Sequence, residues 1–463
     1  MTYKLAITGK HHAHLVDHLL PGDGLEAAAI LLCSKSSDRR LLVKCVLPIL
    51  HSNCKVRLPD QITWPGTAIE EAIDKAELEG LSIVLIHSHP GGMFDFSSVD
   101  DESDRRVIPS LFEGAVSPST PHGSAIMTPD GAILARIYQR NLSFEYVESV
   151  ICASDDISIW RASDIGKLAK RPMAFSSGMR EDLSHITACV VGVSGTGSIV
   201  AEQLARMGVG RLILIDFDLV EFKNMNRIIN ATLEDAAAER NKAAMFASRV
   251  KLYRDDIKID VIEASIGSRE AIEAAGEADL LFCCVDSFEG RQMCDLIAST
   301  FLQPLFDVAV TIPTRRTENN EVAIADACGR LDYVYPGGST LLDRNVYSPE
   351  SLRKEYLRSV APEDYDEQVA AGYFKGVKEE APSVITLNMR AASACVMELI
   401  ARCYPYRHEG NDAFSRTTFS LAACEEEYDR ECDFNNLENA NLGCGLKEPL
   451  LGMPCFSVEG EVA

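Results

Sequence analysis

Positive charge is scarce in this 463-residue sequence, which has 45 Lys and Arg against 69 Asp and Glu, a net charge of −24 and an isoelectric point near 4.9. Nucleic acids and anionic membrane surfaces are bound through clustered positive charge, so the balance argues against both partners. No apolar run approaches the roughly 18 residues that a membrane-spanning helix needs. The N-terminal sequence MTYKLAITGKHHAHL also lacks the pattern of a signal peptide, so we expect a cytoplasmic protein.

Paired cysteines are also missing. The sequence has 15 cysteines, but none of them forms a Cys-x-x-Cys pair, which argues against a standard zinc knuckle. In a cytosolic protein these thiols stay reduced, so no disulfide framework is expected either. Apolar residues make up 46% of the chain and charged residues 25%, which is ordinary for a globular protein. The length exceeds what one hydrophobic core usually covers, so two or three domains are expected.

The first 150 residues mix short strands with helices. Apolar runs predict strands at 41–50, 81–90, 123–130 and 131–139. Residues 24–33 and 67–78 are predicted to be helices. The pattern weakens over 151–185, where Ser, Asp, Arg and Pro interrupt it, so we expect a linker or entry segment there.

From residue 186 the sequence alternates buried strands with helices. Strands that are apolar on both faces and alternate with helices form a parallel, doubly wound sheet, which predicts a second α/β domain over 186–420. The remaining residues, 421–463, are strongly acidic: the last forty hold 2 basic and 10 acidic side chains. We expect a solvated acidic tail, with a surface that steers a basic partner as the functional alternative.

The first candidate site is a pair of histidines in the motif His-Ser-His-Pro. His87 and His89 are separated by one residue at the end of a predicted strand, so both imidazoles can point at one ion. Asp100 can supply a third ligand. Three N and O ligands with an open fourth position are typical of a catalytic zinc, because the open position holds the water to be activated.

Two further residues complete a hydrolytic site. Glu26, on the predicted helix 24–33, is the candidate base that carries a proton to the leaving amine, and Ser97 can donate a hydrogen bond to an oxyanion. The pattern Glu…His-Ser-His-Pro-x6-Ser-x-x-Asp resembles the JAMM (MPN-plus) metalloproteases, isopeptidases that cleave after the C-terminal glycine of ubiquitin-like proteins, over about 1–145. The resemblance implies zinc on the three ligands, with Glu26 as acid/base and Ser97 as oxyanion donor. It also implies an α/β domain with a small mixed sheet over 1–150.

The second candidate site begins with a glycine-rich turn between a strand and a helix. Gly192, Gly195 and Gly197 let the backbone approach a phosphate closely, and the following helix offers free N–H groups. Asp216 ends the next strand, where a carboxylate can accept ribose hydroxyls. The middle position of the usual Gly-x-Gly-x-x-Gly pattern is Ser194, so this turn alone indicates a nucleotide only weakly.

The residues after the turn favour adenylation over hydride transfer. Asp218, Asn224, Arg227, Lys242 and Asp286 follow in the order Asp-x-Asp-x5-Asn-x-Asn-Arg, Arg-Asn-Lys and Cys-Val-Asp. Basic side chains neutralise a triphosphate during attack at the α-phosphorus, and an additional carboxylate can hold Mg²⁺ on the phosphates. Hydride transfer has no use for these groups.

These motifs resemble the ThiF/MoeB superfamily, enzymes that adenylate the C-terminal glycine of a ubiquitin-like protein, over about 170–405 and including PSVITLN at 382–388. The resemblance implies a Rossmann-like domain that uses ATP and Mg²⁺ and forms a homodimer. It assigns nucleotide binding to Gly195 and Asp216, phosphate contacts to Asn224, Arg227 and Lys242, and magnesium to Asp286. An arginine from the partner subunit is usual in the family, and Arg171 or Arg180 are the candidates.

The sequence departs from this family in its cysteines. Relatives often hold a structural zinc with two Cys-x-x-Cys pairs, but the corresponding stretch 336–344 has no cysteine, so the second zinc is expected to be absent. A cysteine for thioester transfer is also not evident around 372–378. Cys328 and Cys395 are the nearest candidates, and the periodicity around Cys395 favours a buried helix.

Both halves therefore point to the C-terminal tail of a ubiquitin-like protein. The JAMM site can remove the modifier, or it can trim a precursor in series with adenylation of the exposed glycine. The arrangement resembles bacterial ubiquitin-like conjugation systems of defence operons, in which a separate conjugating enzyme is a possible partner. Two alternatives stay open: a sulfur-carrier activator for cofactor biosynthesis with a carrier-releasing protease, and a non-catalytic module that binds ubiquitin-like tails.

Overall fold

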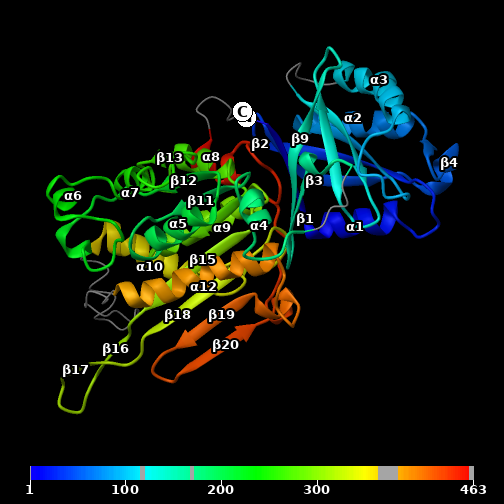
Figure 1. Ribbon diagram of the computed structural model, residues 1–463. Coiled ribbons are helices and arrows are strands. Elements are labelled where there is room, and N and C mark those ends of the chain that lie inside the picture. The colour runs from blue at the N-terminus through cyan, green and yellow to red at the C-terminus, as the bar shows by residue number, and fades with distance from the viewer. Residues whose placement is uncertain (1, 115–119, 167–170, 363–383, 458–463) are drawn as a thin grey trace. The chain divides into compact units, whose positions relative to one another are not determined.

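The computed structural model describes residues 2–114, 120–166, 171–362 and 384–457 (Figure 1). These residues divide into two compact units. The first unit is drawn from Met1–Arg171, Ser299–Leu302 and Asn439–Ala463, and the second from Pro172–Ala298 and Gln303–Glu438. Within the described ranges, no helix is both long enough and apolar enough to cross a bilayer.

The first unit is built on a mixed eight-stranded sheet in the order β1-β3-β2-β6-β7-β8-β9-β10, in which β1 also pairs with β9. Its strands, with the hairpin β4–β5, are β1 (Tyr3–Thr8), β2 (Ala28–Ser37), β3 (Arg40–Pro48), β4 (Val56–Leu58), β5 (Gln61–Thr63), β6 (Ser82–Ser88), β7 (His122–Met127), β8 (Ile133–Tyr138), β9 (Phe144–Ala153) and β10 (Ile157–Arg161). Its helices are α1 (Gly9–Leu19), α2 (Thr67–Glu79), α3 (Ser98–Glu113), η1 (His51–Asn53), η2 (Ala162–Asp164), η6 (Leu450–Gly452) and η7 (Pro454–Phe456). The small mixed sheet expected from the JAMM resemblance is confirmed.

Helices cover both faces of this sheet. Leu15 and Leu19 of α1 pack with Leu31 of β2, whereas Ile108 of α3 packs with Ile30 from the opposite face of the same strand. Successive side chains of a strand point to opposite faces, so a strand covered on both sides is apolar at nearly every position.

This double burial explains one wrong prediction. Residues 24–33 were expected to form a helix, but 28–33 belong to β2 and 24–27 form the loop before it. A short run that is apolar at every position does not distinguish a buried strand from a buried helix. The predicted strands at 41–50, 81–90, 123–130 and 131–139 and the helix at 67–78 are confirmed as β3, β6, β7, β8 and α2.

The second unit contains an eight-stranded sheet in the order β13-β12-β11-β14-β15-β18-β19-β20. Its strands, with the hairpin β16–β17, are β11 (Thr187–Val191), β12 (Arg211–Ile215), β13 (Lys258–Ile262), β14 (Leu280–Cys283), β15 (Leu305–Thr311), β16 (Thr314–Arg316), β17 (Val322–Ile324), β18 (Cys328–Val334), β19 (Arg416–Ser420) and β20 (Glu425–Asp429). Its helices are α4 (Ser177–Leu183), α5 (Gly195–Met207), α6 (Leu233–Ala237), α7 (Lys242–Val250), α8 (Arg269–Gly276), α9 (Phe288–Thr300), α10 (Pro349–Val360), α12 (Ile385–Cys403), η3 (Phe222–Asn224), η4 (Asn411–Phe414) and η5 (Glu431–Asp433).

Five parallel strands, β13 to β15 in the sheet order, form the predicted doubly wound half, and α12 packs on α5, β15 and β18 (Figure 1). The other three strands are antiparallel and extend the sheet beyond the parallel half. The predicted parallel, doubly wound sheet is confirmed over the five parallel strands, and the antiparallel extension was not predicted. The motif stretch 382–388 is described only from residue 384 onward.

Over residues 421–457 the acidic C-terminal stretch is not a solvated tail but contains a strand and short helices. Residues 425–429 form the edge strand β20, whose Glu425, Glu426 and Glu427 are exposed. Charged side chains on an edge strand oppose pairing with another chain, which gives this acidity a structural role. Further on, the Leu446 N–H donates to the Lys35 carbonyl of β2 at 2.9 Å, inside the first unit.

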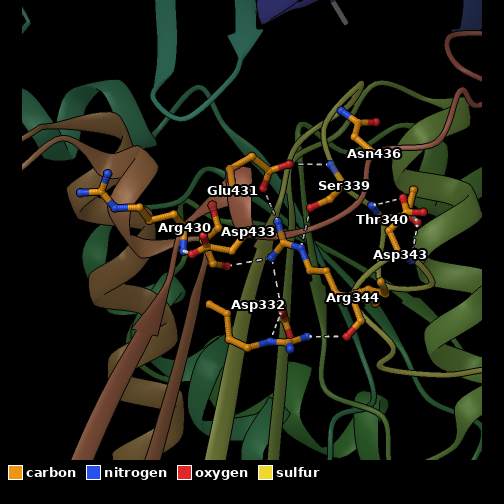
Figure 2. Close-up of polar contacts among 12 residues, drawn as sticks. Asp332, Ser339, Thr340, Asp343, Arg344, Arg430, Glu431, Asp433 and Asn436 are labelled. Atoms are coloured by element: carbon orange, nitrogen blue, oxygen red, sulfur yellow. Dashed lines mark hydrogen bonds and ion pairs between the residues drawn. The ribbon is translucent and has the colours of Figure 1, made fainter.

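A buried arginine fastens the turn after β18, in the stretch that lacks cysteines. Figure 2 shows the Arg344 guanidinium between Asp332 and Glu431, which it contacts at 3.2 and 2.7 Å. Glu431 also accepts the Ser339 N–H at 2.6 Å. The turn is thereby tied to η5 by ion pairs and hydrogen bonds.

Replacing Arg344 by alanine should destabilise the second unit by about 1 to 3 kcal/mol, because Glu431 and the Ser339 hydroxyl lose a buried donor. Asp332 keeps Arg330 and Arg416 as counter-charges. Denaturant unfolding measures this loss. Arg353→Ala, on the exposed face of α10, serves as the control and should change stability by less than about 0.5 kcal/mol. Equal stabilities for the two variants would contradict the role of the buried arginine.

Candidate functional site

The structure brings the three predicted metal ligands of the first unit together. His87 is the penultimate residue of β6 and His89 directly follows the strand, and their Nε2 atoms lie 3.1 Å apart. Asp100, in the first turn of α3, places its two oxygens 3.1 Å from the Nε2 of His87 and 3.4 Å from that of His89. All three side chains are largely shielded from solvent.

Glu26 joins the same cluster from the loop before β2. The ligand atoms of Glu26, His87 and His89 lie within 4.8 Å of one another. The placement follows from the sheet, because Ala28 of β2 is in register with His87 of β6. The prediction that Glu26 stands on a helix is wrong, since the loop and not a helix carries it.

The donor set fits a zinc ion. The Nδ1 of His89 lies 2.9 Å from the Met93 carbonyl, so a proton on Nδ1 donates to that oxygen and leaves Nε2 as the ligand atom. Such a second hydrogen bond is the usual way in which a protein orients a histidine ligand. Two imidazole nitrogens and a carboxylate are also the ligand types that zinc favours.

The two carboxylates of this cluster have pKa values shifted in opposite directions. Burial raises the pKa of Glu26, and the neighbouring histidines oppose that rise only in part. Burial also acts to raise the pKa of Asp100, but hydrogen bonds from His87 and His89 outweigh it and hold the pKa well below the usual range. A carboxylate with a raised pKa beside one that stays ionised suits a pair in which one moves protons and the other holds a cation.

Ser97 is the N-cap of α3. Its Oγ accepts the Asp100 N–H at 3.2 Å, and the Asp100 carboxylate accepts the Ser97 N–H at 2.6 Å, so the two residues form a capping box. The hydroxyl proton of Ser97 takes no part in either bond and can be donated. The Ser-x-x-Asp spacing thus has a local structural reason as well as a chemical one.

Sequence reasoning missed the residues that hold the Glu26 loop. The Arg57 side chain of β4 donates through Nε to the Glu26 carbonyl at 2.9 Å and pairs with Asp23 at 2.6 Å. The Glu26 N–H donates to the Leu58 carbonyl at 2.9 Å. A lone arginine 31 residues from its target leaves no periodic signal in a sequence.

In the second unit, the glycine turn, Asp216 and Asp286 follow three neighbouring parallel strands. β11 lies between β12 and β14, so the ends of all three strands meet at one edge of the sheet. The chain runs from β11 outward to β12 and β13 and then crosses back to β14 on the other side of β11, and such a switch point is where open α/β sheets bind ligands.

The glycines are required by close backbone packing. Gly192 has φ +84°, and a Cβ on Gly197 would stand 1.7 Å from the Gly192 carbonyl oxygen. A Cβ on Gly195 would stand 2.3 Å from the amide nitrogen of Asn388 and 3.3 Å from the Cδ of Arg227. The glycines of the turn therefore leave its backbone uncovered by side chains at the start of α5. The Arg227 side chain lies close to this backbone at Gly195.

The acidic residues after β12 are tied to the turn and to a lysine. Asp216 accepts the Val193 N–H at 2.6 Å and the Asp218 N–H at 2.9 Å, and each oxygen keeps a second lone pair for a ribose hydroxyl. Burial raises the pKa of Asp216 against these hydrogen bonds. Asp218 forms an ion pair with the buried Lys242 at 2.7 Å.

The remaining residues predicted for the adenylation site have fewer contacts with the glycine turn. The buried Asn224 uses its side-chain oxygen to accept the Glu221 N–H at 3.1 Å, which stabilises η3. Asp286 is exposed on the loop between β14 and α9. Arg171 lies 3.8 Å from Asp156 in the first unit, and Arg180 belongs to α4 in the second.

The two candidate cysteines differ in environment. Cys395 is fully buried on α12, where burial raises its pKa well above the usual range, so it belongs to the core. Cys328 is half-buried and lines a groove of about 360 Å³ over β15, β18, β19 and β20. The stretch 372–378 lies outside the described residues.

Two family models match the chain: the ThiF family over residues 168–418, and prokaryotic homologs of the JAB domain over residues 8–138. Ubiquitin-like modifier-activating enzyme 5 of Bombyx mori is 30% identical over 170 residues, and that of Caenorhabditis elegans is 31% identical over 175 residues. Each alignment covers 34% of this chain. It covers only 39% and 36% of those proteins respectively.

Among solved structures, E. coli MccB in complex with ATP matches 55% of this chain and 66% of its own, at 16% identity and a TM-score of 0.41. A similar match is found for the complex of MccB with MccA-N7isoASN, with a TM-score of 0.42. The ThiF model alone spans more than half of the sequence, and both resemblances inferred from the motifs are confirmed. The chain belongs to the ThiF family and carries a prokaryotic JAB domain ahead of its ThiF region.

Proposed function

We propose that the ThiF region adenylates the C-terminal glycine of a ubiquitin-like protein. The observation that carries this proposal is the meeting of the glycine turn, Asp216 and Asp286 at one edge of the sheet, with Lys242 held beside them by Asp218. The names of the activating-enzyme relatives support the same substrate class.

The expected reaction is attack of a terminal carboxylate oxygen on the α-phosphorus of ATP. The new bond is an acyl phosphate, and the bond from the α-phosphorus to the bridging oxygen breaks as pyrophosphate leaves. Arg227 and Lys242 neutralise the phosphate charge, and Asp286 would hold a Mg²⁺ ion on the phosphates. Lys242 has to release Asp218 in order to contact a phosphate. This exchange is favoured because the triphosphate carries more negative charge than one carboxylate.

The JAB domain is proposed to hydrolyse the bond that follows the terminal glycine. Zinc bound by His87, His89 and Asp100 would supply an activated water. Glu26 accepts the proton of that water and passes it to the leaving amine, and a raised pKa suits this double task. Ser97 donates a hydrogen bond to the oxyanion.

We further propose that the two sites act in one prokaryotic ubiquitin-like conjugation system, either in opposition or in series. A cytoplasmic homodimer formed through the ThiF region, with a separate conjugating enzyme as partner, is part of the same proposal. Pyrophosphate exchange with ubiquitin-like proteins of the same genomic neighbourhood tests the adenylation activity of the ThiF region directly. Exchange that Asp286→Ala abolishes is expected, whereas no exchange with any candidate would contradict the activating role.

Arg57→Ala should lower the peptidase kcat about 10- to 100-fold, because the Glu26 loop loses its side-chain anchor and small displacements of a catalytic group cost that much. Zinc content should stay at the wild-type level, since the three ligands are untouched. The measurement is cleavage of a ubiquitin-like protein with a C-terminal extension. Arg106→Ala, on the exposed face of α3, is the control and should cleave normally; equal rates for both variants would refute the anchor.

A further inference from the structure

The last residue of the motif stretch 382–388 is an asparagine of α12 to which the family resemblance assigned no role, and it lies beside the start of α5. Asn388, in the first turn of α12, is only 2% exposed. Its amide nitrogen is the atom that a Cβ on Gly195 would meet, and the Cδ of Arg227 lies 3.3 Å from the same point. The Asn388 carboxamide, the first residue of α5 and the Arg227 side chain therefore converge.

The carboxamide oxygen of Asn388 has an unusual environment. Within the described part of the chain it is buried without a hydrogen-bond partner. Burying a polar atom without a partner is unfavourable, and an apolar residue at this position would avoid that cost. Its neighbours Leu387, Ala391 and Ala392 on α12 are apolar and buried, as packing against α5 requires.

The position also has a defined electrostatic character. α5 begins at Gly195, and the first N–H groups of a helix lack carbonyl partners within it and point toward the N-terminal end. Together with the helix dipole they favour an anion there. Arg227 adds a guanidinium, which donates to the Lys223 carbonyl and the Asn226 side chain at 3.3 Å each, distances typical of weak bonds.

We propose that Asn388 is a phosphate-binding residue of the adenylation site and positions Arg227. Its amide nitrogen donates to a phosphate oxygen of the nucleotide at the start of α5. Its oxygen accepts from the Arg227 guanidinium once that group turns from its two weak bonds toward the phosphates. Both atoms of the carboxamide are then satisfied only in the nucleotide complex. This inference rests on the proposed function, because it presumes that ATP binds at this edge.

Calorimetric titration with ATP and with adenosine tests the proposal. Asn388→Asp has nearly the same shape but turns a donor into a negative charge facing the phosphates. Its affinity for ATP should fall more than 10-fold, while its affinity for adenosine stays within about 2-fold of wild type. Ser393→Asp places the same charge on an exposed position of α12 and should change neither affinity.

Asn388→Ala separates binding from packing. Loss of a carboxamide that packs the fold would lower the melting temperature, whereas loss of an unsatisfied one leaves it unchanged or raises it. The proposal expects the second result together with a weaker affinity for ATP. Unchanged ATP affinity, or equal losses for ATP and adenosine, would overturn it. A wild type that binds ATP but shows no exchange with any ubiquitin-like protein contradicts the proposed function alone.

Discussion

Glu26→Gln should reduce the peptidase kcat by about 10²- to 10⁴-fold, the range that a general acid–base group contributes. Glutamine keeps the shape of the side chain but cannot take the proton of a metal-bound water or deliver one to the leaving amine. The loop itself should stay in place, because its anchors from Arg57 and Leu58 reach the Glu26 backbone. The three ligands are also unchanged, so the zinc content should remain at the wild-type level.

The measurement is cleavage of a ubiquitin-like protein extended beyond its terminal glycine, together with metal analysis of the purified variant. Glu71→Gln removes a carboxylate from the exposed face of α2 and should cleave at the wild-type rate. Activity above a tenth of wild type would refute the role of Glu26 as the base. Loss of zinc together with activity would instead make Glu26 a ligand, which its position among the other ligand atoms also permits.

The same variant decides whether the two sites act in series. If the JAB domain trims a precursor before adenylation, Glu26→Gln should catalyse pyrophosphate exchange with the processed protein but not with the extended one. Exchange with the extended protein at the full rate would exclude the serial order. Opposed action would then remain, with one site attaching a modifier and the other releasing it.

The metal cluster shows how far local patterns reach. His87 and His89 were predictable as a pair because alternate positions of an extended chain place both imidazoles on one side, whereas Asp100 reaches them from the first turn of α3, a helix that was not predicted. Glu26 was correctly expected near the histidines but was placed on a helix instead of a loop. The reason is that the apolar run after it is compatible with a strand or a helix. Arg57 was not predictable, because its role depends on where a separate hairpin packs.

In the second unit, too, the features with a local sequence pattern were predictable, and those that depend on packing between distant segments were not. The parallel strands and the glycine turn have strong local signals, and the structure confirms them. The antiparallel strands β18 to β20 were not predicted because their pairing joins segments far apart in the chain, as Leu331 with Thr417 illustrates. Asn388 ends the motif stretch 382–388, but the family resemblance assigned it no role. Only the position of α12 beside α5 gives it a possible function.

Gly197→Ala should weaken the binding of ATP at least about 100-fold. The new Cβ would stand 1.7 Å from the Gly192 oxygen, 2.9 Å from the Gly192 carbonyl carbon and 3.0 Å from the Cβ of Cys284. Two of these are backbone atoms of the turn, which cannot rotate away as a side chain does. The turn must therefore shift by more than 1 Å, and the N–H groups at the start of α5 lose their alignment with a phosphate.

A hydrogen bond to a charged group is worth about 1.5 to 3 kcal/mol, so the loss of two such bonds lowers the affinity for ATP at least about 100-fold. Titration with ATP measures this loss, and Gly267→Ala is the control, because the nearest atom to its Cβ would be 3.7 Å away. The JAB domain belongs to the other unit, so Gly197→Ala should still cleave an extended ubiquitin-like protein. Retained cleavage shows only that the first unit has folded, so thermal unfolding of the second unit is measured as well, and an unchanged melting temperature there assigns the lost affinity to the turn. ATP affinity within tenfold of wild type would mean that the nucleotide does not bind at this turn.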